Sequence, residues 1–334
     1  SILIQFISLI ILFVVVKDSN DYYKYAAINA FANVGSNIFN ILYCRKYIDL
    51  RICLNLKKVF QHLKSCLIFF SSSLASSIYS NIDTTMLGFM CTDYHVGIYS
   101  ASVKIYVMIK TLLTAITSVT IPRLTYYKTH NMEDIFQQLV SEIFKIMITL
   151  LLPVVIGINV VSRELVIILL GPGFEKSEIV LKILAFAVFF AMFATIINGC
   201  ILLPYKKEKF VLKATITAAV INLIANLIAI PLFQQNGAAV TTIISECVVM
   251  IIGWNFARRI VKLEDVKKVV FTSTIGCIAI IVIANSCEFL SSNVVILLCL
   301  KVILSILAYF VLLFFMKNEI VVKYTKKIWE KVKL

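Results

Sequence analysis

The sequence has few charged residues for its length. Charged residues make up 15% of the 334 residues, whereas hydrophobic residues make up 60%, and the mean hydropathy is +0.95. A soluble domain could not bury that much apolar surface. The composition therefore excludes an ordinary soluble protein and indicates a protein that lies in a membrane.

Paired cysteines, clustered histidines and the common enzyme motifs are also absent from the sequence. The nine Cys show no CxxC spacing, and the three His (His62, His95 and His130) lie far apart in sequence. We therefore expect no disulfide framework, no metal site and no cofactor. There is no DxD, HExxH, GxSxG or P-loop motif, and the connectors are too short for a large extramembrane domain. These absences argue against an enzyme and against ATP-driven transport.

Long apolar spans fill most of the chain instead. At about 1.5 Å per residue, a span of roughly 20 residues crosses a bilayer core of about 30 Å. The sequence therefore predicts an all-α integral membrane protein with about ten transmembrane helices. The predicted spans are 1–16, 22–43, 65–90, 97–120, 141–161, 178–203, 214–233, 237–256, 269–287 and 293–316.

Lys and Arg are sorted to one side of these spans. Of the 32 Lys and Arg residues, 23 lie in alternate connectors and the tail, at 44–64, 121–140, 204–213, 257–268 and 317–334. Because Lys and Arg are retained in the cytoplasm, we predict a multi-pass protein of the cell membrane with a cytoplasmic C-terminal tail. Topology and anionic membrane lipids explain the net charge of +14, so we expect no nucleic-acid partner.

Polar side chains cluster in the third and fourth spans. Ionisable groups are costly in a membrane, so each is a candidate functional residue. Ser76, Ser80 and Asp83 share one helix face by their i, i+4, i+7 spacing, and Asn81 lies beside them. The alternative for the Ser residues is close helix packing alone. The fourth span carries a second stripe, formed by Tyr99, Tyr106, Lys110, Thr114 and Thr117.

Two Lys residues in the fourth span have contrasting predicted roles. Asp83 and Lys104 each lie about 12 Å from the turn that joins their helices, so we predict that they form a buried pair. Lys110 lies about 9 Å deeper with no obvious carboxylate at its depth, so we expect it to face a central cavity alone. Elsewhere, Glu246 is either an ion-coupling carboxylate or a packing partner. Asn198 is either a cavity residue or a hydrogen-bonding link between helices.

Three segments together resemble a known family. They run from Asn81 through Gly88 into Val96–Ile105, from Leu169 through Ser177 into Leu181–Leu184, and from Asn226 through Pro231 into Asn236–Thr242. In order and spacing they are similar to the polysaccharide-exporter branch of the multidrug/oligosaccharidyl-lipid/polysaccharide flippase superfamily, which has a MATE-like fold.

The resemblance implies a domain organisation. Residues 65–258 would form the C-terminal six-helix lobe, and 1–43 the last two helices of the N-terminal lobe. Residues 44–64 would form a cytoplasmic amphipathic linker, 269–316 two accessory helices, and 317–334 a basic cytoplasmic tail. The first span starts at Ser1 without a signal peptide's charged region, so we interpret the chain as N-terminally truncated.

The resemblance also implies a function, namely flipping of polyprenyl-diphosphate-linked oligosaccharide by alternating access. Lys104 and Lys110 would meet the diphosphate, and the Ser, Thr, Tyr and Asn side chains would meet the sugars. Membrane lipids and a coupling ion, H⁺ or Na⁺, are the other expected partners. Three alternatives remain open: a cation-coupled multidrug exporter using Asp83 and Glu246, a membrane sugar polymerase, and a non-transporting scaffold.

Overall fold

The computed structural model describes residues 2–17, 21–46, 63, 80–263, 265–290 and 293–332. Every regular element in these ranges is helical, and the chain divides into two compact units, Ser1–Phe70 and Ser71–Leu334. Most of the predicted linker 44–64 lies outside the described residues, as does Ser76.

The first unit contains a pair of apolar helices. Helix α1 spans Ile2–Val15 and helix α2 spans Tyr22–Cys44, and the two pack against each other. Gly35 of α2 lies at this contact, since a Cβ atom there would be in van der Waals contact with the Ile4 side chain. The bounds of both helices agree with the first two predicted spans.

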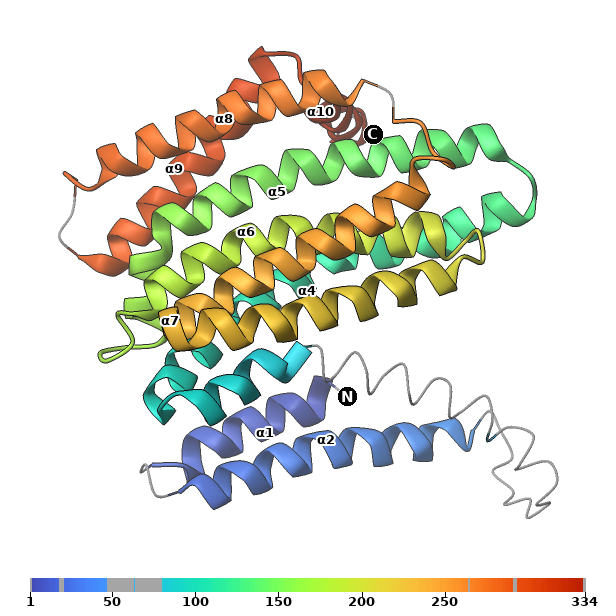
Figure 1. Ribbon diagram of the computed structural model, residues 1–334. Coiled ribbons are helices and arrows are strands. Elements are labelled where there is room, and N and C mark those ends of the chain that lie inside the picture. Colours follow the sequence, from blue (N-terminus) through green and yellow to red (C-terminus); the bar gives the residue numbers. More distant parts are fainter. Residues whose placement is uncertain are drawn as a thin grey trace. The chain divides into compact units, whose positions relative to one another are not determined.

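The second unit is a bundle of long helices (Figure 1). Residues 80–90 are helical. The elements that follow are α4 (Asp93–Thr129), α5 (Glu133–Leu169), α6 (Ser177–Ile196), the π-helix η1 (Ile197–Leu202), α7 (Glu208–Ala257), α8 (Val266–Cys287), α9 (Val294–Phe315) and α10 (Glu319–Val332). Six helices in the described ranges, from α4 to α9 with η1 counted with α6, are long and apolar enough to cross a membrane. The prediction of an all-α multi-pass membrane protein is confirmed.

Helix α6 forms the centre of this unit. It packs against α4, α5 and α7, and its apolar side chains are largely buried. Helix α5 contacts both α6 and the α8–α9 pair, so it joins the central helices to the last two spans. Two predicted connectors are shorter than expected, because α4 and α5 extend to within three residues of each other and α5 continues to Leu169. The turn after α5 contains Gly171 and Gly173, whose φ angles are positive at 79° and 93°.

Helix α7 is a helical hairpin of two arms that meet at Gln234. Gln234 has φ 52° and ψ −130°, values that no helix contains, so the chain reverses there. Gly237 is required at this turn, because a Cβ atom would lie 2.2 Å from the Ala229 carbonyl oxygen. The first half of α7 (208–233) and its second half (235–257) match the two spans predicted for this region.

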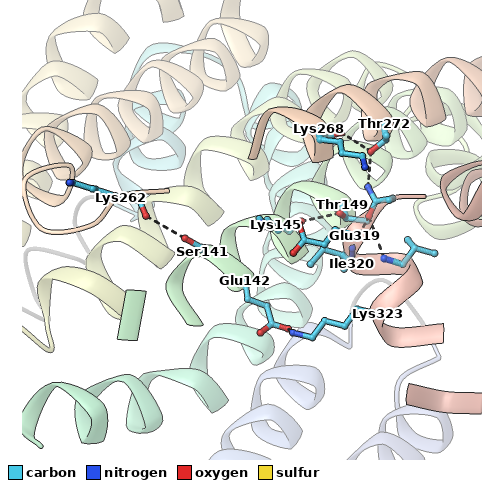
Figure 2. Close-up of polar contacts among 12 residues, drawn as sticks. Ser141, Glu142, Lys145, Thr149, Lys262, Lys268, Thr272, Glu319, Ile320 and Lys323 are labelled. Atoms are coloured by element: carbon cyan, nitrogen blue, oxygen red, sulfur yellow. Dashed lines mark hydrogen bonds and ion pairs between the residues drawn. The ribbon is translucent and has the colours of Figure 1, made fainter. Parts of the chain in front are cut away.

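Polar contacts hold the amphipathic helix α10 against the bundle (Figure 2). The Lys145 ammonium lies 2.8 Å from Glu319, and the Lys323 ammonium lies 2.6 Å from Glu142. The Asn318 amide, just before α10, donates a hydrogen bond of 2.7 Å to the Thr272 hydroxyl of α8. These contacts link α10 to both α5 and α8.

Candidate functional site

A buried carboxylate lies where the helical segment 80–90 meets α4 and α7. Asp83 is 7% exposed. Its Oδ2 accepts hydrogen bonds from the hydroxyls of Tyr99 (2.9 Å) and Thr242 (2.8 Å), and its Oδ1 accepts one from the Asn226 amide. Among the described residues, no Lys or Arg lies within ion-pair distance of Asp83. Neutral donors therefore stabilise this carboxylate.

The α7 hairpin supplies a second layer of oxygen atoms around Asp83. Asn222 and Asn226 lie one turn apart on the first half of α7, and the Asn226 amide also donates to Asn222 Oδ1 at 3.1 Å. Thr241, on the second half, donates its hydroxyl to Asn226 Oδ1. The reversal at Gln234 brings these groups together, and the contact of His95 with Gln235 (2.6 Å) links the turn to α4.

An ion pair lies further along the same helices. The Lys110 ammonium of α4 is 3.1 Å from Glu246 Oε1 of α7, and the Tyr106 hydroxyl donates to the same oxygen at 3.1 Å. The side chain of Lys110 is 32% exposed and that of Glu246 is 10% exposed. Thr242 and Glu246 are four residues apart, so one face of α7 carries the partners of both Asp83 and Lys110.

Lys110 opens onto a hollow of about 410 Å³ along α4. Thr114 lies within it and donates its hydroxyl to the Lys110 carbonyl at 2.7 Å. The hollow offers one ammonium group and several hydroxyls to a ligand. Its lining residues are Val107, Lys110, Thr111, Thr114, Ala115 and Ser118.

Two predicted features of this region are wrong. Asp83 does not pair with Lys104, because its oxygens accept from Tyr99, Asn226 and Thr242, and Lys104 is exposed. Lys104 lies about 160° around α4 from Tyr106, so matched depth alone was not sufficient for pairing. Lys110 does not lie alone either, because Glu246 of α7 pairs with it.

The other predicted residues lie outside this hydrogen-bonded group. Ser80 and Asn81 are exposed near the start of the described part of their helix. Asn198 lies in the π-helix η1, and its Oδ1 is buried without a hydrogen-bond partner among the described residues. Whether any of these residues contacts a cargo stays a prediction.

Two partners of Asp83 were missed by sequence reasoning, namely Asn226 and Thr242. Both have a signal in the sequence, because Asn222–Asn226 and Thr242–Glu246 repeat at i, i+4 within apolar spans. Such spacing places each pair on one helix face, but it does not say which carboxylate the face contacts.

Comparisons with known proteins point to one group. The profile of a family described as polysaccharide biosynthesis protein matches residues 1–128. The chain is 27% identical over 210 residues to a protein of Haloferax volcanii described as the low-salt glycan biosynthesis flippase Agl15. It is 28% identical over 236 residues to a protein of Shigella dysenteriae described as an O-antigen transporter.

These matches cover only part of the relatives. They include 63% and 69% of this chain but 44% and 56% of the two proteins, so the chain spans about half the length of the curated relatives it matches. Among solved structures, the lipid II flippase MurJ in an inward closed conformation is similar with a TM-score of 0.73 and 16% identity. That similarity covers 90% of this chain and 64% of MurJ, and it concerns the fold alone.

Proposed function

Because the chain belongs to the multidrug/oligosaccharidyl-lipid/polysaccharide flippase superfamily, we propose that it translocates a polyprenyl-diphosphate-linked oligosaccharide across the cytoplasmic membrane. The cargo would serve the synthesis of surface polysaccharide. The protein would act as a transporter and not as an enzyme. Its relatives are described as flippases and O-antigen transporters, which supports this class of cargo.

The pair formed by Lys110 and Glu246 carries the proposal. A diphosphate needs a cationic partner at membrane depth, and Lys110 is the ammonium group that lines the α4 hollow. Its side chain is 32% exposed, so a phosphate oxygen can approach without unfolding the site. The phosphate of the cargo would replace Glu246 as the ion-pair partner of Lys110. Hydroxyls such as those of Thr111 and Ser118 would bind sugar.

This exchange favours an anionic cargo over a cationic drug. A multidrug exporter would need an uncompensated carboxylate on the hollow. Glu246 already has an ammonium partner, and Asp83 is saturated by neutral donors within the bundle. Both carboxylates are thus poorly placed to attract a cationic drug.

Asp83 is the residue we propose for the coupling ion. Its carboxylate contacts the Asn226 amide and the Thr242 hydroxyl, and the oxygens of Asn222 and Thr241 contact Asn226 in turn. Carboxylate, amide and hydroxyl oxygens suit Na⁺, whereas a proton would need only the carboxylate. Transport that depends on Na⁺ and is lost in Asp83→Asn supports the first choice. Transport that depends only on a pH gradient supports the second.

The domain assignment follows the same proposal. Residues 65–258 would form one lobe of an alternating-access transporter, and residues 1–43 would belong to the other lobe. Residues 269–316 would be accessory helices, and the tail 317–334 would lie in the cytoplasm. The motion itself would expose the α4 hollow to each membrane face in turn.

The decisive experiment replaces Lys110 in the source organism. Lys110→Gln should abolish surface polysaccharide at matched protein level, and Lys110→Arg should retain part of it, since charge is the first requirement. Lys267→Gln is the control, because this exposed Lys lies on α8 and does not line the hollow. Normal polysaccharide in Lys110→Gln, or equal loss in Lys267→Gln, would overturn the proposal.

A further inference from the structure

A second, polar pocket lies at one end of the bundle, away from the α4 hollow. It forms where α5 ends, α6 begins and α8 meets α9 (Figure 1). Its volume is about 480 Å³, which is within the range of about 300–1,000 Å³ seen for small-molecule sites. Six charged residues line it: Arg163, Glu164, Glu178, Lys182, Glu288 and Lys301.

A buried ion cluster forms the inner wall of this pocket. The Lys301 ammonium donates to Glu164 Oε1 at 2.8 Å and to Glu288 Oε1 at 3.2 Å, and the Lys301 side chain is 2% exposed. Glu164 is 5% exposed, yet its Oε2 has no hydrogen-bond partner among the described residues. A buried carboxylate oxygen without a donor is costly, so this atom points to a donor that comes from a ligand.

The rim of the pocket offers the opposite charge. Arg163 is exposed, and none of the described residues forms an ion pair with it. Lys182, by contrast, is paired with Glu178 at 2.6 Å. The pocket therefore presents one acceptor inside, at Glu164, and one cation at the rim, at Arg163. The three basic and three acidic side chains cancel, which favours a ligand with no net charge.

The surroundings of the pocket suit a lipid. The outer face of α9 exposes apolar side chains, with Val295, Ile296 and Ile303 more than half exposed. In a membrane, acyl chains would cover this face. The pocket lies at the ends of the same helices, which is the level of lipid headgroups when the helices span the bilayer.

We infer that this pocket binds the headgroup of a phospholipid with a primary amine, of the phosphatidylethanolamine type. The ammonium group donates to Glu164 Oε2, and the phosphate pairs with Arg163. The bound lipid then fills the space between α5–α6 and the α8–α9 pair, and supplies the hydrogen bond that Glu164 lacks.

Phosphatidylcholine is the sharpest control for this assignment. It carries the same phosphate and the same net charge, but its quaternary ammonium has no N–H to donate. The measurement is native mass spectrometry of the purified chain in detergent, titrated with phosphatidylethanolamine, phosphatidylcholine or phosphatidylglycerol of equal acyl chains. We expect phosphatidylethanolamine to bind about tenfold more tightly than phosphatidylcholine, as one charge-assisted hydrogen bond predicts.

Two variants assign the preference to the named residues. Glu164→Gln should bring the affinities for phosphatidylethanolamine and phosphatidylcholine close together. Arg163→Gln should weaken both lipids, because it removes the phosphate partner, while Arg259→Gln, an exposed Arg outside the pocket, should weaken neither. Arg163 is exposed, so its variant keeps the test valid even if Glu164→Gln does not fold.

Three results would overturn the inference. Equal affinity for phosphatidylethanolamine and phosphatidylcholine in the unmodified protein would show that binding does not depend on an N–H donor in the headgroup. Tighter binding of phosphatidylglycerol would show a simple anion site. Unchanged lipid affinity in Arg163→Gln would show that the lipids bind elsewhere on the protein.

Discussion

Two of the Lys–Glu clusters in the bundle differ in how far protein encloses them. Lys301 is 2% exposed and contacts two carboxylates, those of Glu164 and Glu288. Lys110 is 32% exposed, contacts the single carboxylate of Glu246, and opens onto a hollow. The first ammonium is enclosed by protein, whereas the second can exchange its partner.

This difference indicates a mainly structural role for the Lys301 ammonium and a functional role for the Lys110 ammonium. Removing one partner of an enclosed pair leaves a buried charge unpaired, whereas an accessible partner can be replaced by solvent or ligand. The same residue types therefore predict opposite effects of substitution in the two clusters. Loss of Lys301 should affect folding first, and loss of Lys110 should affect transport first.

The largest expected effect is on stability at Lys301. Lys301→Met leaves Glu164 and Glu288 without their cation and should cost about 3–5 kcal/mol of folding free energy. Lys110→Met is the matched control and should cost clearly less, because the Lys110 side chain is 32% exposed and the Tyr106 hydroxyl also donates to Glu246. Thermal unfolding in detergent measures both, and the double variant Lys301→Met/Glu164→Gln should regain part of the loss. Equal losses of stability in Lys301→Met and Lys110→Met would show that the two clusters do not differ in enclosure in the way proposed.

The second prediction compares two Gly residues, namely Gly237 at the turn of the α7 hairpin and Gly276 on α8. At Gly237 a Cβ atom would lie 2.2 Å from a backbone oxygen, and at Gly276 it would lie 2.6 Å from the Tyr309 ring. Overpacking of this kind typically costs about 1–3 kcal/mol. Gly237→Ala should lose more stability than Gly276→Ala, since a side chain can shift more easily than backbone.

Gly157→Ala is the control for this pair, because a Cβ atom at Gly157 would meet nothing within 4 Å. It should leave the unfolding temperature unchanged or slightly raised. A loss in Gly157→Ala as large as in Gly237→Ala would show that close approach at the hairpin is not the cause.

The third prediction concerns Asp83 and Lys104. Asp83→Asn disturbs three hydrogen bonds and should cost about 1–3 kcal/mol, whereas Lys104→Gln should stay within about 0.5 kcal/mol of the parent. Their effects should add in the double variant, because the two residues share no contact. A double variant that is more stable than Asp83→Asn alone would indicate that Asp83 and Lys104 do interact, as the sequence predicted.

The smallest effect is expected at the docked helix α10. The side chains of Lys323 and Glu142 are 55% and 26% exposed, so their pair should contribute about 0.2–1 kcal/mol. The hydrogen bond that Lys323 donates to the Glu142 carboxylate raises the pKa of Lys323 above its ordinary value. This contribution is therefore full below the unfolded pKa of about 10.4 and is lost as pH rises through the higher folded-state pKa.

The measurement for this pair is the unfolding temperature of Lys323→Met relative to the parent at low and high salt. The difference should shrink in high salt, because solvent-exposed charges are screened. A difference independent of salt would indicate that packing of the Lys323 stem, and not its charge, holds α10.

Much of the fold was predictable from hydropathy alone. The bounds of α1, α2, α8 and α9 agree with predicted spans to within a few residues, and α8 and α9 are each long and apolar enough to cross a membrane. The helix ends in the polar connectors were less predictable. Helices α4 and α5 extend past their apolar parts, and α4 continues through Pro122 to Thr129.

The polar pairings were the least predictable part of the site. The depth of a residue in the membrane follows from counting residues along its helix, and matched depth predicted a pair between Asp83 and Lys104. Two of the actual partners, Asn226 and Thr242, lie more than 140 residues away in sequence, one on each arm of the α7 hairpin. The orientation in the membrane and the sites of cargo and ion stay predictions.

The sequence by itself determined which residues lie in apolar helices, where the α5–α6 turn and the α7 reversal fall, and which few polar groups accompany them. Those features depend on local chemistry, namely hydropathy and the backbone freedom of Gly. Only the tertiary structure decided that Lys110 meets Glu246, that Lys301 meets Glu164, and that Asp83 meets neutral donors. The reason is that each pairing depends on how helices rotate and pack against one another, and packing selects one helix face among several that the sequence pattern allows.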